Sequence, residues 1–148
     1  MFDKIVVGID GSKTSENAMR TACDIAAKYG SELHLVHTPQ PQTVAFAMGA
    51  VASYHLVSTM PSHSEVMEGG EKILDQGRAI AKECNQAITQ TYMEVGDPAH
   101  HIVECAEKTG SDLIVTGRRG LGSLGALVQG STSSSINKLA KCACLSVV

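Results

Sequence analysis

Residues 113–131 read LIVTGRRGLGSLGALVQGS, a short apolar run followed by a glycine framework in the order G-x2-G-x9-G-S. The run Leu113-Ile114-Val115 predicts a buried strand, and the residues from Ser131 onward predict a helix. Glycines directly after a strand allow a tight turn and let a ligand approach main-chain N–H groups. The hydroxyl cluster 131–135 opens the helix, where unpaired N–H groups and the helix dipole favour an anion. This order of features predicts a phosphate-binding site.

Apolar runs alternate with helical patterns along the rest of the chain. Strands are predicted at 5–9, 33–37, 89–95, 113–116 and 145–148, and helices at 12–29, 65–86, 98–110 and 131–141. Short, nearly continuous apolar strands separated by amphipathic helices are typical of α/β proteins. We therefore predict a five-stranded parallel, doubly wound sheet in a three-layer α/β/α arrangement.

Two strand orders are compatible with this alternation. The order 3-2-1-4-5 places Asp10, at the end of the first strand, next to Gly117 in the glycine loop. The order 2-1-3-4-5 places Asp10 next to the turn at Gly96-Asp97 instead. Ligands of such sheets bind beyond the carboxyl ends of the strands, where the strand order reverses. Because the glycine loop follows the fourth strand, the order 3-2-1-4-5 explains more of the sequence.

Length and composition limit the classes of function. The 148 residues suffice for one domain, predicted to span 1–148. With no Trp, two Phe and three Tyr, the core must be aliphatic, and a stacking platform for single-stranded nucleic acid is not expected. The net charge of −3 also argues against a nucleic-acid partner. Residues 108–148 nevertheless hold five Lys/Arg and one Asp, which suits an anionic ligand.

The segment 39–64 contains no Lys, Arg, Asp or Glu. Membrane insertion is not expected, because polar residues and a glycine interrupt its apolar part and basic anchors do not flank it. We predict a variable loop or short helix. No signal peptide is recognisable, and five scattered cysteines fit reduced thiols, so a cytoplasmic location is expected.

Four segments carry a family resemblance: IVVGIDGS at 5–12, GDP at 96–98, residues 112–120, and Gly130-Ser131 onward. Together they make the chain similar to the single-domain, ATP-binding universal stress proteins. The resemblance implies an adenine nucleotide α-hydrolase-like fold with strand order 3-2-1-4-5, and ATP with Mg²⁺ as the ligand. It implies these ligand-binding positions: Gly8, Ile9, Asp10, Thr38, Thr116, Gly117, Arg118, Arg119, Gly120, Gly130, Ser131, Thr132 and Ser133.

The resemblance also suggests which part of the ligand each of these residues contacts. Asp10 and the backbone at Thr38 match positions beside adenine, the loop glycines match positions near ribose and phosphates, and residues 130–133 match the phosphate-contacting helix start. Purely structural roles are the alternative for several of these residues. Asp10 and the serine run can simply cap helices. Arg118, where the family often has Ser, and Arg119 either reach a phosphate or form a solvated pair.

Other motifs give weaker signals. The chain has no G-x-x-x-x-G-K-[ST], and the G-x-G-x-x-G at Gly120, Gly122 and Gly125 lacks the context of a dinucleotide fingerprint. The pair Cys142 and Cys144 suits buried structural cysteines better than a metal site, and no metal is predicted. We expect a packed, hydrogen-bonded His34, and one buried and one exposed ring from His100-His101.

No catalytic residues are predicted, because no Ser/His/Asp or paired-carboxylate arrangement can be assembled. The leading hypothesis is a regulatory, stress-response module that acts through nucleotide-dependent conformation or partner binding, with slow ATP hydrolysis at most. The alternatives are an adenine-nucleotide-hydrolysing enzyme of the same fold and a nucleotide-free interaction module.

The last predicted strand bears on assembly. In the order 3-2-1-4-5 it is an edge strand, and Leu145-Ser146-Val147-Val148 has neither Lys nor Pro to block pairing with another chain. The family often pairs this strand with its copy. We therefore predict a homodimer through residues 144–148.

Overall fold

A computed structural model describes residues 1–41, 44, 61–119 and 131–148, with only the backbone described for Ser131. Strands and helices alternate along these residues. In chain order they are β1 (Lys4–Gly8), α1 (Lys13–Tyr29), β2 (Glu32–His37), α3 (His63–Glu83), β3 (Ile88–Met93), α4 (Pro98–Thr109), β4 (Leu113–Gly117), α5 (Ser131–Leu139) and β5 (Ala143–Val147).

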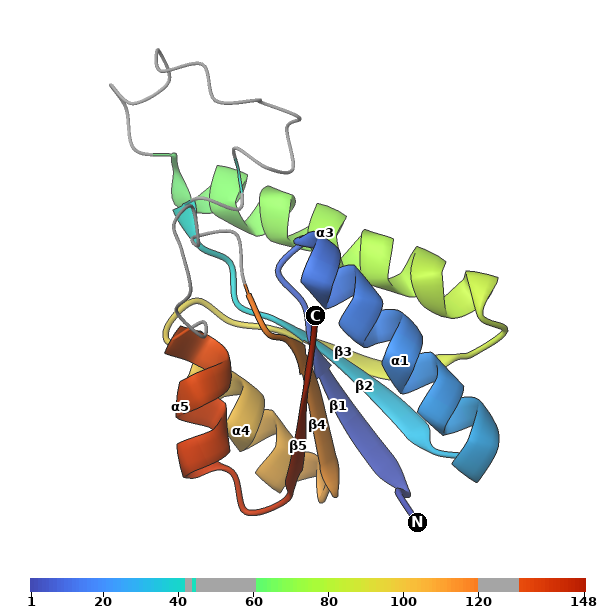
Figure 1. Cartoon of the computed structure of the whole chain (residues 1–148). Coiled ribbons are helices and arrows are strands. Elements are labelled where there is room, and N and C mark those ends of the chain that lie inside the picture. The colour runs from blue at the N-terminus through green and yellow to red at the C-terminus, as the bar shows by residue number, and fades with distance from the viewer. Residues whose placement is uncertain (42–43, 45–60, 120–130) are drawn as a thin grey trace.

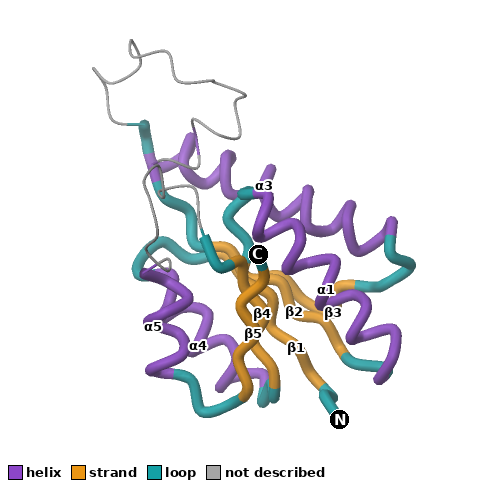
Figure 2. The backbone as a smooth tube through the Cα atoms, in the orientation of Figure 1, coloured by secondary structure: helices purple, strands orange, loops and turns teal. Residues whose placement is uncertain are grey.

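The strands form one parallel sheet in the order β3-β2-β1-β4-β5, which confirms the predicted order 3-2-1-4-5. Helices α1 and α3 cover one face of the sheet, and α4 and α5 cover the other (Figure 1). The backbone trace in Figure 2 shows the same three layers, with the strands between the two helix pairs. The predicted α/β/α architecture is therefore confirmed. It places the carboxyl ends of β1 and β4 side by side.

Local sequence sets where the helices begin and end. Ser12 caps α1 by accepting a hydrogen bond from the N–H of Ser15, and Asp97 caps α4 in the same way, with Pro98 in the first turn. Both helices end at glycines with a left-handed backbone, Gly30 with φ of 71° and Gly110 with φ of 67°. These boundaries agree with the prediction.

Other boundaries differ from the prediction. Helix α3 begins at His63 rather than at residue 65, because a capping box of hydrogen bonds forms directly before its first turn. The helix ends at Glu83 rather than at residue 86. Strand β5 begins at Ala143 rather than at residue 145, because it pairs with the whole of β4, from Leu113 to Gly117. Strand β3 covers 88–93 rather than 89–95, and α5 ends at Leu139.

The core consists of two aliphatic clusters, one on each face of the sheet. Ile5, Val7 and Leu35 pack against α1 and α3, whereas Val6 and Val36 pack against α4 and α5. Alternate residues of one strand thus enter different clusters, so both faces of the sheet must be covered. The predicted segment 39–64 lies mostly outside the described residues. No helix among the residues described is long and apolar enough to cross a membrane.

Three of the histidines that the structure describes are buried in this aliphatic interior: His34, His37 and His101. Both ring nitrogens of His34 lack a hydrogen-bond partner, although Nε2 lies 3.6 Å from a carboxylate oxygen of Glu32. The prediction for His34 was therefore right about packing and wrong about hydrogen bonding. Burial lowers the pKa of all three imidazoles, because it penalises the charged form.

This burial predicts an acid-sensitive fold. The unfolded chain takes up protons on these histidines at higher pH than the folded chain does. The free energy of unfolding should therefore fall as the pH drops from about 8 to about 5.5, by about 1.4 kcal/mol for each unit of pKa depression. Urea unfolding across this range measures the effect. His34→Leu should flatten the profile, whereas the exposed His100→Gln should not; equal slopes in both variants would contradict this origin.

Candidate functional site

Eight of the predicted ligand-binding residues, those from Gly8 to Asp10, Thr38 and those from Thr116 to Arg119, lie at the carboxyl ends of β1, β2 and β4. Strands β1 and β4 pair directly, with Gly8 opposite Thr116. Asp10 follows the end of β1, and Gly117 ends β4, so the two predicted segments emerge next to one another. This adjacency distinguishes the observed strand order from the alternative, in which Asp10 would lie beside Gly96-Asp97.

A short network of hydrogen bonds shapes the turn after β1. Gly11 has φ of 84°, a backbone conformation that favours glycine. The Asp10 carboxylate accepts a hydrogen bond of 2.9 Å from the N–H of Ser12, and the Asp10 N–H donates to the Ser15 hydroxyl. The capping residue of α1 is Ser12, not Asp10. Asp10 therefore supports the start of the helix indirectly, while its carboxylate lies at the carboxyl edge of the sheet.

The segment after β4 is held by three other elements. The hydroxyls of Ser12 and Thr14, at the start of α1, both donate to the carbonyl oxygen of Arg119. The N–H of Arg118 donates to the carbonyl of Val147 at 2.7 Å, and Ser133 of α5 approaches the Arg118 carbonyl at 3.5 Å. The main chain at Arg118-Arg119 is thus tied to α1, β5 and α5. Both arginine side chains remain exposed.

Ser12 and Thr14 were not among the predicted site residues. Their signal in the sequence is the hydroxyl pair on either side of Lys13, directly after the Asp10-Gly11 turn. That pair reads equally well as an ordinary helix start, because Ser and Thr are favoured there. Only the proximity of the Arg119 carbonyl shows that these hydroxyls also anchor the loop that follows β4.

Two predicted ligand-contacting glycines are required by packing. A Cβ added to Gly117 would lie 2.7 Å from Thr14 Oγ1 and 2.8 Å from the backbone nitrogen of Ser15. A Cβ on Gly8 would lie 2.6 Å from Cδ1 of Ile102 in α4. The first glycine lets α1 approach the end of β4, and the second lets α4 approach the end of β1. The absence of side chains here brings both helices close to the carboxyl edge.

The end of β2 forms the other side of the site. Thr38 is buried, and its hydroxyl lies 2.8 Å from Nδ1 of His101 in α4. His37 is also buried, and its Nδ1–H donates to the carbonyl of Ile9 at 2.7 Å. The predicted contrast between the rings of His100 and His101 is confirmed, since His101 is buried and His100 is exposed.

Some predicted positions lie outside the described residues, namely Gly120 and Gly130. Helix α5 begins at Ser131, as predicted; Thr132 is partly buried, and Ser133 is buried. The positive end of the helix dipole is therefore at Ser131, one residue after the last glycine of the framework. The structure brings Ile9, Asp10, Thr38, Thr116, Gly117, Arg118 and Arg119 to one edge of the sheet, with Ser133 joined to that edge through the Arg118 carbonyl.

Among the described residues, no group of three His, Cys, Asp or Glu side chains comes together. All five cysteines are free, and Cys142 and Cys144, which were predicted to be buried, are partly buried. Burial raises the pKa of both thiols, which disfavours the thiolate needed for metal binding.

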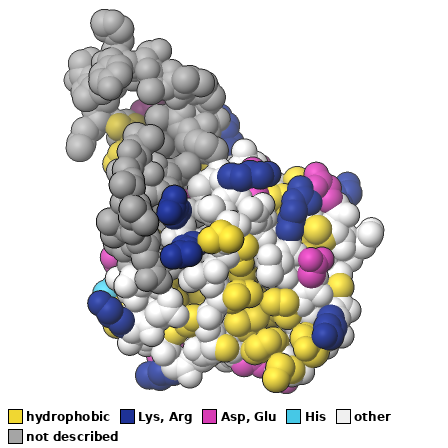
Figure 3. All heavy atoms as spheres, in the orientation of Figure 1, with side chains coloured by type: hydrophobic (Ala, Val, Ile, Leu, Met, Phe, Trp, Pro, Cys, Tyr) yellow, Lys and Arg dark blue, Asp and Glu magenta, His cyan; other side chains and the backbone are white. Residues whose placement is uncertain are grey.

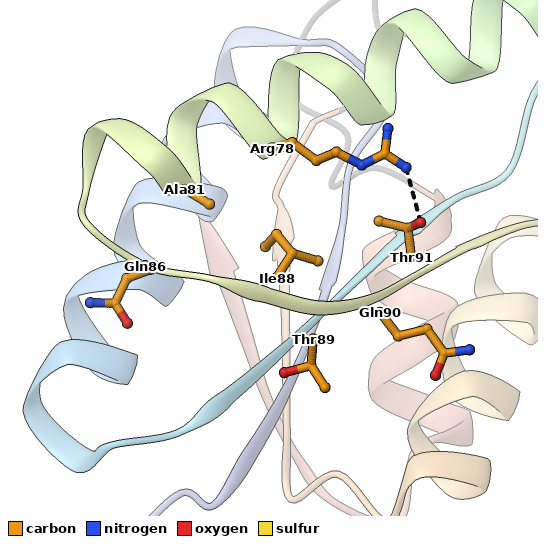
Figure 4. A pocket seen from close by; sticks show the side chains of 7 residues that line it. All are labelled: Arg78, Ala81, Gln86, Ile88, Thr89, Gln90 and Thr91. Atoms are coloured by element: carbon orange, nitrogen blue, oxygen red, sulfur yellow. Dashed lines mark hydrogen bonds between the residues drawn. The ribbon is translucent and has the colours of Figure 1, made fainter.

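A separate pocket of about 340 Å³ lies beside β3, and none of the predicted ligand-binding residues lines it. Figure 4 shows its lining side chains, most of which come from α3 and β3. Its one charged lining group is the guanidinium of Arg78, which donates to Asp75 at 2.7 Å and to Thr91 at 3.0 Å. Because Arg78 already has these partners, the pocket offers a ligand no unpaired charged side chain. It is not part of the predicted site.

Comparisons with known proteins agree with this geometry. Universal stress protein YxiE of Bacillus subtilis is 32% identical over 153 residues, which cover 99% of both chains. A universal stress protein solved in complex with cAMP superposes with a TM-score of 0.71 at 25% identity, over 99% of this chain and 97% of that chain. The universal stress protein of Archaeoglobus fulgidus in complex with dAMP gives a TM-score of 0.71 at 19% identity, over 99% and 98%.

The family model matches almost the whole chain. It covers residues 1–147 and therefore includes every element of the sheet and both segments that meet beyond β1 and β4. With the relatives above, this match shows that the chain belongs to the universal stress protein family.

Proposed function

We propose that this protein binds an adenine nucleotide, ATP with Mg²⁺, beyond the carboxyl ends of β1, β2 and β4. The observation that carries the proposal is the convergence of the Asp10–Ser12 turn and the Gly117–Arg119 segment, held together through the Arg119 carbonyl. Ligands of doubly wound sheets bind at such a reversal of strand order. The solved relative that contains cAMP, a smaller adenine nucleotide, supports the same class of ligand.

The residues present fit an anionic nucleotide. Two exposed guanidiniums, at Arg118 and Arg119, are available for phosphate oxygens. Helix α5 begins at Ser131, and the start of a helix favours an anion through the helix dipole. Mg²⁺ would enter with the triphosphate, which is its usual mode of binding in nucleotide sites.

We propose a regulatory role rather than dedicated catalysis. Nucleotide occupancy would set the conformation of the segments after β2 and β4, or the choice of partner, during a stress response. Hydrolysis of ATP, if any, would be slow, because positioning and Mg²⁺ alone give limited acceleration. We further propose a single domain over 1–148 and a cytoplasmic location.

Thermal unfolding with and without nucleotide tests the proposed ligand. ATP at about 100 times its dissociation constant should stabilise the protein by roughly 2.7 kcal/mol, and ADP and AMP should act at their own affinities. NAD should have little effect. Gly130→Val, which adds a branched side chain beside the predicted phosphate position, should remove the shift while circular dichroism stays unchanged. A flat response of the wild-type protein to every nucleotide would favour a nucleotide-free interaction module.

The two arginines provide a test of orientation. Arg118→Ala and Arg119→Ala should each weaken ATP about tenfold if the guanidinium makes a charge-assisted hydrogen bond to phosphate, and should leave adenosine binding unchanged. Arg20→Ala is the matched control, because Arg20 is paired with Glu83 at 2.8 Å on the outer side of α1. Calorimetric titration measures both ligands. Equal losses for ATP and adenosine would contradict phosphate contact.

We also propose a homodimer through β5. This strand is an edge of the sheet, and Leu145 and Val148 are exposed. Hydrophobic side chains gather on the face of the molecule where β5 lies in front (Figure 3). An edge without Lys or Pro leaves N–H and C=O groups open to pairing with a second copy. A two-fold axis would bring the same surface of both copies together.

Leu145→Lys tests this assembly without disturbing the core. Val147 is less suitable, because it packs against the core cluster on the α1 face. A lysine at the exposed position 145 should shift the protein to monomer in light scattering, through charge repulsion and lost apolar contact. Val95→Lys, at an exposed position after β3, should leave the mass unchanged. A wild-type protein that is monomeric at micromolar concentrations would refute the dimer.

A further inference from the structure

Two cysteines from different helices meet where α1 packs against the end of α3. Cys23, in α1, is 1% exposed and belongs to the aliphatic cluster on this face of the sheet. Cys84 directly follows the last turn of α3 and packs against the same cluster, but it is only partly buried. Helices α1 and α3 lie side by side over this face (Figure 1). The pair thus combines one buried thiol with one that solvent can reach.

A salt bridge holds the two helices together at this point. Nη2 of Arg20 lies 2.8 Å from Oε2 of Glu83. Cys23 comes one helical turn after Arg20, and residues with that spacing are neighbours on a helix surface. Cys84 directly follows Glu83. The ion pair therefore keeps the end of α3 against the part of α1 that carries Cys23.

The ionisation of the neighbouring groups shows how close the Cys84 sulfur lies. Burial, and after it the nearby Cys84, raises the pKa of the Cys23 thiol to about 12. Glu83 raises the pKa of Arg20, and Cys84 adds to this effect. The Cys84 sulfur therefore lies beside both the Cys23 thiol and the Arg20 guanidinium. Cys23 keeps its proton near pH 7, which makes it a poor nucleophile toward an oxidant in solution.

The backbone at Cys84 can adjust more easily than the interior of a helix. Cys84 lies outside the last turn of α3, and Asn85 has φ of 55°, a left-handed conformation that Asn adopts more readily than most residues. A disulfide needs the two Cβ atoms about 3.5–4.5 Å apart. Movement of this end turn alone can bring the Cys84 sulfur to bonding distance from Cys23 while α1 stays in place.

The sheet separates this pair from the other cysteines. Cys105 belongs to the cluster on the α4 and α5 face, and Cys142 and Cys144 pack against that cluster. Burial raises the pKa of the Cys105 thiol to about 11, so this cysteine is also a poor nucleophile. Within one molecule, Cys23 is therefore the thiol that can reach Cys84.

We infer that Cys84 and Cys23 form a peroxide-reactive thiol pair, in which Cys84 is the attacking thiol and Cys23 the resolving thiol of an intramolecular disulfide. Cys84 is accessible to the oxidant, and the positive charge of Arg20 stabilises the negative charge on the attacking sulfur. The bond would join α1 covalently to the end of α3. This modification site is independent of the proposed nucleotide site.

The reaction has two steps. In the first, the Cys84 thiol loses its proton and its sulfur attacks one oxygen of hydrogen peroxide. The O–O bond breaks, the other oxygen leaves as hydroxide and takes up a proton to form water, and Cys84 becomes a sulfenic acid. In the second, the Cys23 sulfur attacks the Cys84 sulfur, the S–O bond breaks, and the departing hydroxide takes the Cys23 proton. One peroxide is reduced to two waters as two thiols are oxidised to one disulfide.

Mass spectrometry of the full chain after oxidation tests the inference. The reduced protein is treated with hydrogen peroxide, its remaining thiols are alkylated, and its peptides are mapped. The wild-type protein should lose two hydrogen atoms and two reactive thiols, and should yield a peptide that links Cys23 to Cys84. Dithiothreitol should reverse the change. Cys142→Ser, a matched control on the other face of the sheet, should form the same bond.

Variants of the pair test the two roles. In Cys23→Ala the sulfenic acid at Cys84 should persist and be trapped by dimedone, whereas Cys84→Ser should give no dimedone adduct at Cys23. Arg20→Gln should slow oxidation of Cys84 by about threefold to tenfold, because the positive charge is lost. Glu83→Gln breaks the same ion pair but keeps that charge, so it should not slow the reaction. Equal slowing in both variants would contradict the role given to Arg20.

The wild-type peptide map decides the inference even if a variant fails to fold. Oxidised wild-type protein that retains a free Cys23 thiol, with Cys84 present as sulfenic acid or linked to a second molecule, would overturn it. A first bond between Cys142 and Cys144 would overturn it as well. Nucleotide binding does not enter the measurement, so failure of the proposed nucleotide site would leave this result unchanged.

Discussion

The direct pairing of β1 with β4 is the constraint on which the rest of the site depends. It places Gly8 opposite Thr116 and brings the turn at Asp10 next to the segment at Gly117. The strand order reverses here, because β2 and β3 lie on one side of β1 while β4 and β5 lie on the other. The chain after β1 leads into α1 on one face of the sheet and the chain after β4 leads to α5 on the other, while the first turn of α1 binds the Arg119 carbonyl.

Close helix packing follows from this pairing and explains two of the glycines. Gly117 has no room for a Cβ because Thr14 and Ser15 approach the end of β4, and Gly8 is crowded by Ile102. The same absence of side chains that permits this packing also leaves main chain near the carboxyl edge. Loss of a glycine here is expected to affect folding as well as binding.

The aliphatic core imposes a cost on the polar residues within it. Among the buried histidines that the structure describes, His37 donates to a carbonyl, which defines its tautomer, His101 shares a hydrogen bond with the Thr38 hydroxyl, and His34 has only a distant carboxylate. Neutral imidazoles are tolerated in such surroundings, but protonated ones are not, which links stability to pH. His101 differs from the other two because its partner, Thr38, belongs to the candidate site.

The sequence by itself determined the alternation of strands and helices, most helix ends and the position of the glycine framework. These features depend on local causes: apolar periodicity, capping residues such as Ser12 and Asp97, and the left-handed glycines at 30 and 110. The position of the glycine framework favoured the strand order, which the family resemblance also implied, and the resemblance added the predicted residues of the candidate site. Only the tertiary structure decided what depends on contacts between distant segments. The anchoring of Arg119 by Ser12 and Thr14, the tight contact at Gly117 and the hydrogen bond between Thr38 and His101 join residues that no local pattern connects, because the spacing between them is set by strand pairing and helix packing.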